Sequence, residues 1–121
     1  MNQPDFTILY VADPLKSAEF YSKLWGIEPV DSAPGFVLFV LANKSKFGLW
    51  LKTEVEPAPT GGPGSSEICL SVETEAGLHE LHRQCQGQGI PILQAPSAMD
   101  FGLTFVIADP DGHRLRVFKP A

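Results

Sequence analysis

The stretch that decides the fold is FVIADPDGHRLRVF, residues 105–118, near the end of the chain. An apolar run leads into DPDG at residues 109–112, and a second run follows. Pro fixes φ and Gly adopts positive φ, so DPDG predicts a tight turn between two strands. Side chains alternate along the return strand, which puts Leu115 and Val117 on one face and Arg116 on the other. Arg116 is thus a charge in an otherwise apolar strand.

The composition is that of one small globular domain. The chain has 121 residues, a net charge of -5 and two cysteines. An acidic chain without a Lys/Arg cluster is a poor partner for nucleic acid or for an anionic membrane. Two cysteines cannot build a disulfide framework, and no apolar run is long enough for a membrane span or a signal peptide. We therefore expect a soluble cytoplasmic protein.

The first half of the chain predicts a strand, a helix and three short strands. The expected first strand is Phe6–Val11. Asp13 can cap a helix that starts at Pro14, and Gly26 ends it. The three strands that follow are expected at Glu28–Asp31, Gly35–Leu41 and Lys46–Lys52.

The second half repeats this plan after a linker. Residues 53–66 are rich in Pro and Gly and show no periodicity, so they divide a first module at about 5–52 from a second at 67–118. Thr74 is the expected cap of the second helix. The other predicted features are a strand at Glu67–Val72, a buried helix side of Leu78, Leu81, His82 and Cys85, closing glycines Gly87 and Gly89, a strand at Ile90–Gln94 and a loop at Ala95–Gly102.

An offset of sixty-one residues aligns the two halves. Leu9 then falls on Leu70, and Gly26 falls on Gly87. Any two amphipathic strand–helix pairs give some matches of this kind. Because cap, helix length and terminal Gly coincide, we interpret the pattern as an internal duplication of a βαβββ unit.

A family resemblance lies in Val11-Ala12-Asp13, Ser17, Phe20-Tyr21, Leu24-Trp25-Gly26 and the ending at 105–117 around DPDG. In these residues the chain resembles the vicinal oxygen chelate superfamily, which includes glyoxalase I, extradiol dioxygenases and the bleomycin- and phenazine-binding resistance proteins. The resemblance implies an α+β fold in a single domain, 1–121. Two βαβββ modules would form curled sheets around a shared cavity, with the helices outside. It also implies a homodimer, since many short members dimerise.

Catalytic members of this superfamily hold a divalent metal with His, Glu or Gln from the first and last strands of each module. The resemblance places these positions at Phe6, Trp50, Glu67 and Arg116. Phe and Trp offer no donor, and Arg is a permanent cation. A slip of Trp50 by one or two positions brings in only Gly, Leu or Lys. We therefore predict no metal, no other cofactor and no catalytic residue.

The candidate ligand-binding residues share strand faces with these four positions, because side chains alternate along a strand. Phe101, in the expected loop, would form the mouth of the cavity together with Met99. The full candidate set is Phe6, Ile8, Tyr10, Trp50, Glu67, Cys69, Phe101, Arg116 and Phe118. Aromatic rings with one carboxylate and one guanidinium suit a flat apolar molecule that carries a polar group. Trp50 would stack on its ring, as in phenazine-type members, and Arg116 would form a fork with a carboxylate.

The sequence predicts metal-independent binding and sequestration of a small planar aromatic compound, of the antibiotic-resistance type. Some alternatives stay open. Glu67 and Arg116 can pair with each other as readily as with a ligand, and Phe6 and Trp50 can be ordinary core residues. The chain could also be a metal-dependent lyase or dioxygenase with an atypical site, or an interaction module filled by its own side chains.

Overall fold

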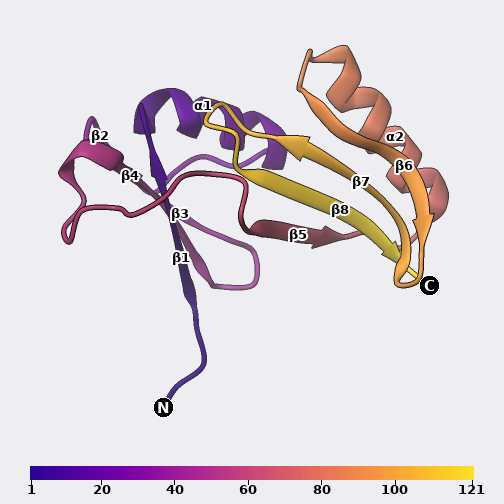
Figure 1. The fold of residues 1–121 in the computed structure, drawn as a ribbon, viewed down its shortest axis with the longest axis horizontal. Helices are drawn as coiled ribbons and strands as arrows, with labels where there is room; N and C mark the ends of the chain where they lie inside the picture. The colour runs from indigo at the N-terminus through magenta and orange to yellow at the C-terminus, as the bar shows by residue number, and fades with distance from the viewer. The chain divides into compact units, whose positions relative to one another are not determined.

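The computed structural model describes residues 1–121, which form two compact units, Met1–Gly61 and Gly62–Ala121. We call them unit 1 and unit 2. Unit 1 contains β1 Phe6–Val11, α1 Pro14–Trp25, β2 Asp31–Ala33, β3 Phe36–Val40, β4 Lys46–Leu51 and a 3-10 turn at Lys52–Glu54. Unit 2 contains β5 Glu67–Ser71, α2 Glu75–Gly87, β6 Ile92–Met99, β7 Gly102–Ala108 and β8 Arg114–Pro120. The predicted α+β fold of two βαβββ modules is confirmed (Figure 1).

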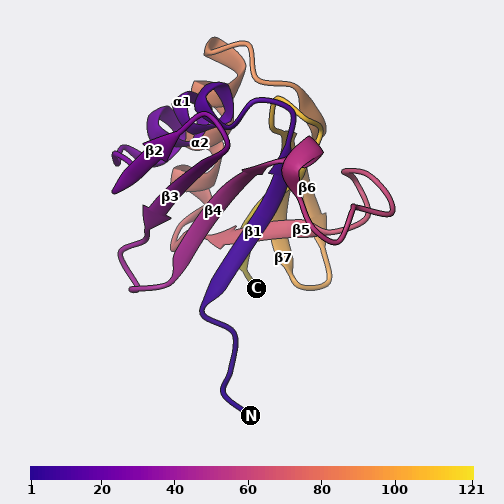
Figure 2. The same ribbon diagram turned by 90° about the vertical axis from the view of Figure 1, so that its left-hand side faces the viewer.

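The two sheets have the same topology. Their strand orders are β1-β4-β3-β2 and β5-β8-β7-β6. In each, the first strand pairs in parallel with the last, and the other neighbours are antiparallel. The helix of each unit contacts one face of that unit's sheet, as Figure 2 shows for α1. We call the opposite face of each sheet its open face.

The core of unit 1 lies between α1 and its sheet. Asp13 Oδ1 accepts from the backbone N–H of Lys16 at 3.3 Å, which caps the helix before Pro14. The helix ends at Gly26, whose φ of 67° lies in the left-handed region. The rings of Tyr21 and Trp25 each lie 4.9 Å from that of Phe47. This aromatic cluster fixes the inner face of β4 against the helix.

The core of unit 2 is mainly aliphatic, with Phe105 as its one buried aromatic hydrocarbon ring. Leu78 on α2 and Leu115 on β8 are fully buried with it. Thr74 caps α2 by accepting from the N–H of Gly77 at 2.9 Å. The three confirmed cap positions, Asp13, Thr74 and Gly26, show that the helix termini follow from local chemistry.

The DPDG turn forms as predicted. The carboxylate of Asp109 accepts from the backbone N–H groups of Asp111 at 2.9 Å and His113 at 2.8 Å. Gly112 adopts a φ of 95°, which only glycine takes without strain. The turn therefore closes on itself and aligns β7 with β8.

Some predicted boundaries are wrong. β2 begins at Asp31, where the expected strand ends. The expected loop at 95–102 is largely strand, because β6 continues to Met99 and β7 begins at Gly102. Register shifts on either side of Gln94 let β6 keep pairing with β7 although it contains Pro96. Strand pairing thus overrides the weak strand propensity of this segment.

Three smaller expectations also change. Leu81 is 38% exposed, since Leu78, His82 and Cys85 form the inward stripe of α2. Gly87 belongs to the helix, and the left-handed glycine is Gly89, with a φ of 73°. The expected linker starts with the 3-10 turn and buries Val55.

Neither α1 nor α2 has the length and apolar character that a membrane span needs.

Candidate functional site

The open face of unit 1 is a mainly apolar surface made of three rows of side chains. The strand register sets the rows as Tyr10–Trp50–Phe36–Ala33, Ile8–Gly48–Leu38–Asp31 and Phe6–Lys46–Val40. Phe6, Ile8 and Tyr10 are each 40–42% exposed. Large apolar side chains that gather on an accessible surface are typical of an interaction site.

Trp50 lies in the middle of the aromatic row. Its ring contacts Tyr10 edge-on at 6.2 Å and 78°, and Phe36 at 6.3 Å and 69°. Aromatic pairs prefer this edge-to-face geometry, which holds the indole in place between two neighbours. Trp50 remains half-buried. It is therefore a positioned ring on an accessible face, not a residue of the helix–sheet core.

Gly48 has no side chain, and this lets the neighbouring aromatic rings cover β4 on the open face. A Cβ at Gly48 would lie 2.6 Å from Cζ of Phe36 and 3.1 Å from Cε1 of Phe6. The two rings therefore lie against the bare backbone of β4. Sequence reasoning missed Phe36 and Leu38, because every position of 36–40 is apolar and no alternation marks the two faces.

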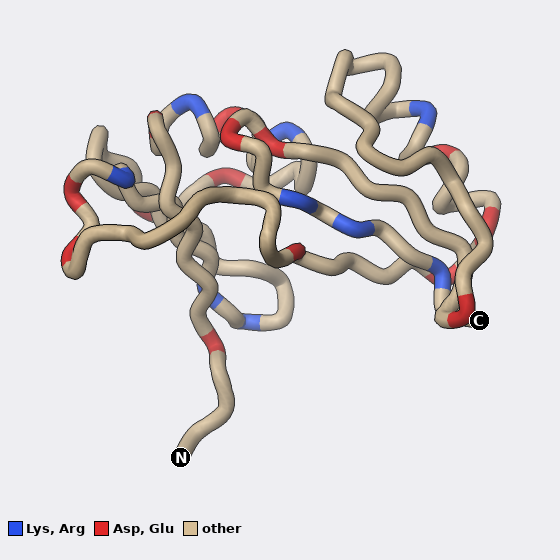
Figure 3. Tube along the Cα trace, viewed as in Figure 1, with Lys and Arg blue, Asp and Glu red and all other residues tan.

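The open face of unit 2 is polar at the corresponding rows. The register gives Ser71–Phe118–Thr104–Ser97, Cys69–Arg116–Val106–Gln94 and Glu67–Arg114–Ala108. Charges of both signs are spread along the chain, and β8 carries basic residues within its strand (Figure 3).

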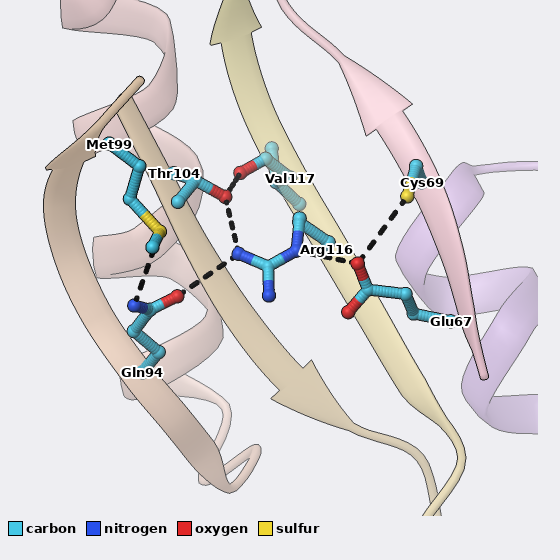
Figure 4. A network of polar contacts seen from close by, with 7 residues as sticks. All are labelled: Glu67, Cys69, Gln94, Met99, Thr104, Arg116 and Val117. Atoms are coloured by element: carbon cyan, nitrogen blue, oxygen red, sulfur yellow. Dashed lines mark hydrogen bonds and ion pairs between the residues drawn. The ribbon is translucent and has the colours of Figure 1, made fainter. Parts of the chain in front are cut away.

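Arg116 is the centre of a hydrogen-bond network (Figure 4). Its Nε donates to Oε1 of Glu67 at 2.7 Å, and its Nη1 donates to Oε1 of Gln94 at 3.1 Å and Oγ1 of Thr104 at 3.3 Å. Thr104 donates in turn to the carbonyl of Val117 at 2.9 Å. The Arg116 and Glu67 side chains are 18% and 32% exposed. The predicted alternative of a Glu67–Arg116 ion pair is therefore confirmed.

Two aromatic residues adjoin this network. The guanidinium carbon of Arg116 lies 5.7 Å from the centroid of the Phe101 ring, a cation–π distance. Phe101 meets Phe118 edge-on at 6.0 Å. The structure thus brings together Phe101, Arg116 and Phe118, although Phe101 sits in the β6–β7 turn and not in a long loop. Thr104 was missed because the predicted strand began at Phe105, whereas β7 begins at Gly102. Gln94 lies in a predicted strand, but only the register of β6, β7 and β8 places it in the row of Arg116.

Cys69 lies beside the ion pair, with Sγ 3.9 Å from Oε1 of Glu67. Burial raises the pKa of the Cys69 thiol, and the Glu67 carboxylate raises it further, while Arg116 acts in the opposite direction. Burial alone raises the pKa of Cys85 in the core. Both cysteines are free thiols. Cys69 is therefore a neutral thiol at pH 7 and a weak nucleophile.

The register corrects one predicted equivalence. Ile8 pairs with Gly48 in unit 1, and at the same place in unit 2 Cys69 pairs with Arg116. The counterpart of Arg116 is therefore Gly48, and Trp50 corresponds to Phe118. The prediction was two residues off because β6 and β7 are longer than β2 and β3, so the offset between the halves grows along the chain.

The corrected positions do not fit a divalent metal. Phe6 and Gly48 provide no donor atom, and Arg116 is a cation. Glu67 provides a carboxylate, but this carboxylate is bonded to Arg116. No group of three or more His, Cys, Asp or Glu side chains is arranged to hold a metal ion. The donor chemistry therefore gives no basis for metal-assisted catalysis at these positions.

Comparison with known proteins places the chain in a family. Residues 3–117 match the model of the Glyoxalase/Bleomycin resistance protein/Dioxygenase superfamily. The chain belongs to this superfamily. The resemblance inferred from the sequence is thereby confirmed, and the match extends over both units.

Three relatives illustrate the range of the superfamily. The phenazine antibiotic resistance protein EhpR of Enterobacter agglomerans is 32% identical over 117 residues, covering 94% of this chain and 89% of EhpR. The solution structure of protein ATC0852 from Agrobacterium tumefaciens is 48% identical with a TM-score of 0.91, covering 100% and 99% of the two chains. A glyoxalase-related enzyme from Fulvimarina pelagi is 27% identical with a TM-score of 0.84, covering 98% and 88%.

Proposed function

We propose that this protein binds and sequesters a small planar aromatic compound without a metal ion, as a homodimer in the cytoplasm. The observation that carries the proposal is the open face of unit 1, where Trp50 lies between Tyr10 and Phe36 on an accessible apolar surface. The similarity to a phenazine antibiotic resistance protein supports a planar heteroaromatic ligand. The homodimer is proposed because members of the superfamily commonly dimerise.

The aromatic row would bind the ring system of the ligand. Tyr10 and Phe36 hold Trp50 edge-on, so little side-chain entropy is lost when a ring packs against it. An aromatic pair adds about 0.5–1.5 kcal/mol beyond the area that it buries. Phe6 and Ile8, both 40% exposed, would cover the rest of the ring. These contacts have no directional polar requirement and favour flat apolar molecules.

Taken by itself, the open face of unit 2 would recognise a polar substituent on an aromatic ligand. Arg116 and Glu67 supply charged groups, Cys69 a neutral thiol, and Phe101 and Phe118 apolar contact. The corrected metal positions favour binding over catalysis, since Glu67 is committed to Arg116. The nine predicted site residues thus remain the proposed set, with Phe36, Gln94 and Thr104 added.

Titration of the purified protein with phenazine tests this function by Trp fluorescence and calorimetry. We expect saturable binding, and Trp50→Ala should weaken it about tenfold or more, because it removes a central aromatic contact. Val30→Ala is the matched control, since Val30 is 62% exposed and lies outside the open face. Absence of saturable binding across a panel of planar heteroaromatics would contradict the proposal.

Metal independence needs a separate measurement. Protein dialysed against a chelator should bind phenazine with unchanged affinity, and added Zn²⁺, Mn²⁺, Fe²⁺ or Ni²⁺ should not alter it. Stoichiometric metal in the purified protein, with binding or turnover that depends on it, would favour the lyase or dioxygenase alternative. Sedimentation velocity tests the homodimer, which predicts a species of twice the 13.2 kDa chain mass.

A further inference from the structure

We infer that the polar group recognised on the ligand is a neutral donor–acceptor pair, of the primary carboxamide kind, and that Glu67 makes the site select against a carboxylate. This inference rests on the proposed binding of a planar aromatic ligand. It adds the chemical class of the substituent and a residue that determines specificity.

The hydrogen-bond network leaves one donor group and one acceptor atom unused. Nε and Nη1 of Arg116 are bonded to Glu67, Gln94 and Thr104, and Nη2 makes no hydrogen bond. Glu67 accepts through Oε1 from both Arg116 and Cys69, and its Oε2 accepts none. Figure 4 shows that Nη2 and the second carboxylate oxygen project toward the same side of the ion pair. An unused donor and an unused acceptor therefore lie on the same side of the ion pair.

This arrangement differs from the usual arginine–carboxylate pair. Two parallel N–H···O bonds commonly join the two groups, and they consume both edges. Here a single 2.7 Å bond joins them, so the remaining edge stays available. In a primary carboxamide, one carbon atom carries both a carbonyl oxygen, which accepts hydrogen bonds, and an NH2 group, which donates them. Its oxygen can accept from Nη2 of Arg116 while its N–H donates to Oε2 of Glu67.

The charge of a carboxylate makes it a poorer ligand for the Glu67–Arg116 pair than a neutral carboxamide. Glu67 neutralises Arg116 at 18% and 32% side-chain exposure, so an anion meets no net positive charge from the pair. It would also face the lone pairs of Oε2, and an unfavourable group of this kind is a common source of specificity. Arg114 lies on the same face but is exposed, so solvent screens its charge.

The surroundings restrict how the edge can be approached. The Phe101 ring lies 5.7 Å from the guanidinium carbon and meets Phe118 edge-on. An aromatic ring attached to the carboxamide can pack against these two side chains. The sequence-based expectation that Arg116 forms a fork with a ligand carboxylate is replaced, because Glu67 already occupies part of the guanidinium.

The test compares phenazine-1-carboxamide with phenazine-1-carboxylate at pH 7.5 by calorimetry, with unsubstituted phenazine as a third probe. We expect the carboxamide to bind about tenfold tighter than the carboxylate, because only the carboxamide satisfies both unused groups. In Glu67→Gln, an amide N–H replaces Oε2 and the negative charge is lost. The edge then offers donors only, and the preference should reverse toward the carboxylate.

Glu80→Gln is the matched control, because Glu80 pairs with Arg83 on the solvent-exposed side of α2. The same change of charge there should leave the preference unaltered. If phenazine binds but the carboxylate equals or exceeds the carboxamide in the unmodified protein, the inference fails while the proposed function stands. If none of the three compounds binds, the proposed function itself fails. An unchanged preference in a folded Glu67→Gln variant also overturns the role of Glu67.

Discussion

The two open faces occupy equivalent places in equivalent sheets and differ in nearly every side chain. The strand registers of the two sheets make these positions equivalent: Tyr10 and Ser71, Phe36 and Thr104, Ile8 and Cys69, Phe6 and Glu67, Gly48 and Arg116, and Trp50 and Phe118. One face is apolar and aromatic, and the other is a polar network. The shared backbone pairing therefore fixes where side chains lie and leaves their chemistry to the individual residue.

The Gly48/Arg116 pair shows how one position organises its neighbours. At Gly48 the absent side chain lets Phe36 and Phe6 lie over the strand. At Arg116 the guanidinium is partly buried, and a charge in that position needs hydrogen-bond acceptors. Gln94 and Thr104 supply them together with Glu67. Exchanging residues between the faces should therefore break the packing of one or the pairing of the other.

Gly48→Arg should have the largest effect. The new Cβ would lie 2.6 Å from Phe36 and 3.1 Å from Phe6, so both rings must move, and the new charge would enter a mainly apolar face. We expect a loss of about 2–4 kcal/mol in the free energy of unfolding, measured with urea. Gly62→Ala, where a Cβ meets nothing within 4 Å, should change it little. Equal stability of the two variants would disprove the account of Gly48.

Arg116→Met tests the polar face. It keeps an unbranched stem in place of the arginine stem and leaves Glu67, Gln94 and Thr104 without their shared donor, at an expected loss of about 1–3 kcal/mol in urea unfolding. Arg83→Met breaks an ion pair whose side chains are 64% and 55% exposed. That exposed pair should contribute less than about 0.5 kcal/mol. If both variants lose the same unfolding free energy, the network around Arg116 stabilises the fold no more than an exposed ion pair does.

Phe36→Thr places the residue of unit 2 into the aromatic row of unit 1. Its loss removes the edge contact with Trp50 at 6.3 Å, and we expect about 1 kcal/mol lower stability together with weaker phenazine binding. Val40→Thr changes the end of another row on the same strand and serves as control. Full phenazine affinity in Phe36→Thr would remove that ring from the proposed site.

The smallest expected effect is a change in the pH dependence of alkylation at the Cys69 thiol. Its pKa is raised by burial and by Glu67 and lowered by Arg116, so alkylation by iodoacetamide should stay slow until the pH lies above the ordinary pKa of a cysteine thiol. Glu67→Gln should shift the rate profile to lower pH, and Arg116→Met to higher pH. Because a raised thiol pKa favours the protonated folded state, its contribution to stability is lost as pH rises through that pKa. Cys69→Ser identifies which thiol reacts.

The sequence by itself determined the features that depend on neighbouring residues. The DPDG turn, the caps Asp13 and Thr74, the left-handed Gly26 and the doubled βαβββ order all follow from short-range chemistry. The family resemblance follows from the same motifs at their spacing, and residues 3–117 match the superfamily model.

Only the tertiary structure decided which side chains meet across the strands. The pairing of Glu67 with Arg116, the help of Gln94 and Thr104, and the placement of Gly48 opposite Ile8 all depend on register between distant segments. The extra length of β6 and β7 changes the sequence separation between equivalent strands by an amount that no local pattern records, because strand pairing tolerates Pro96 and bulges. Register, set by the assembled sheet, therefore separates an aromatic face from a polar one.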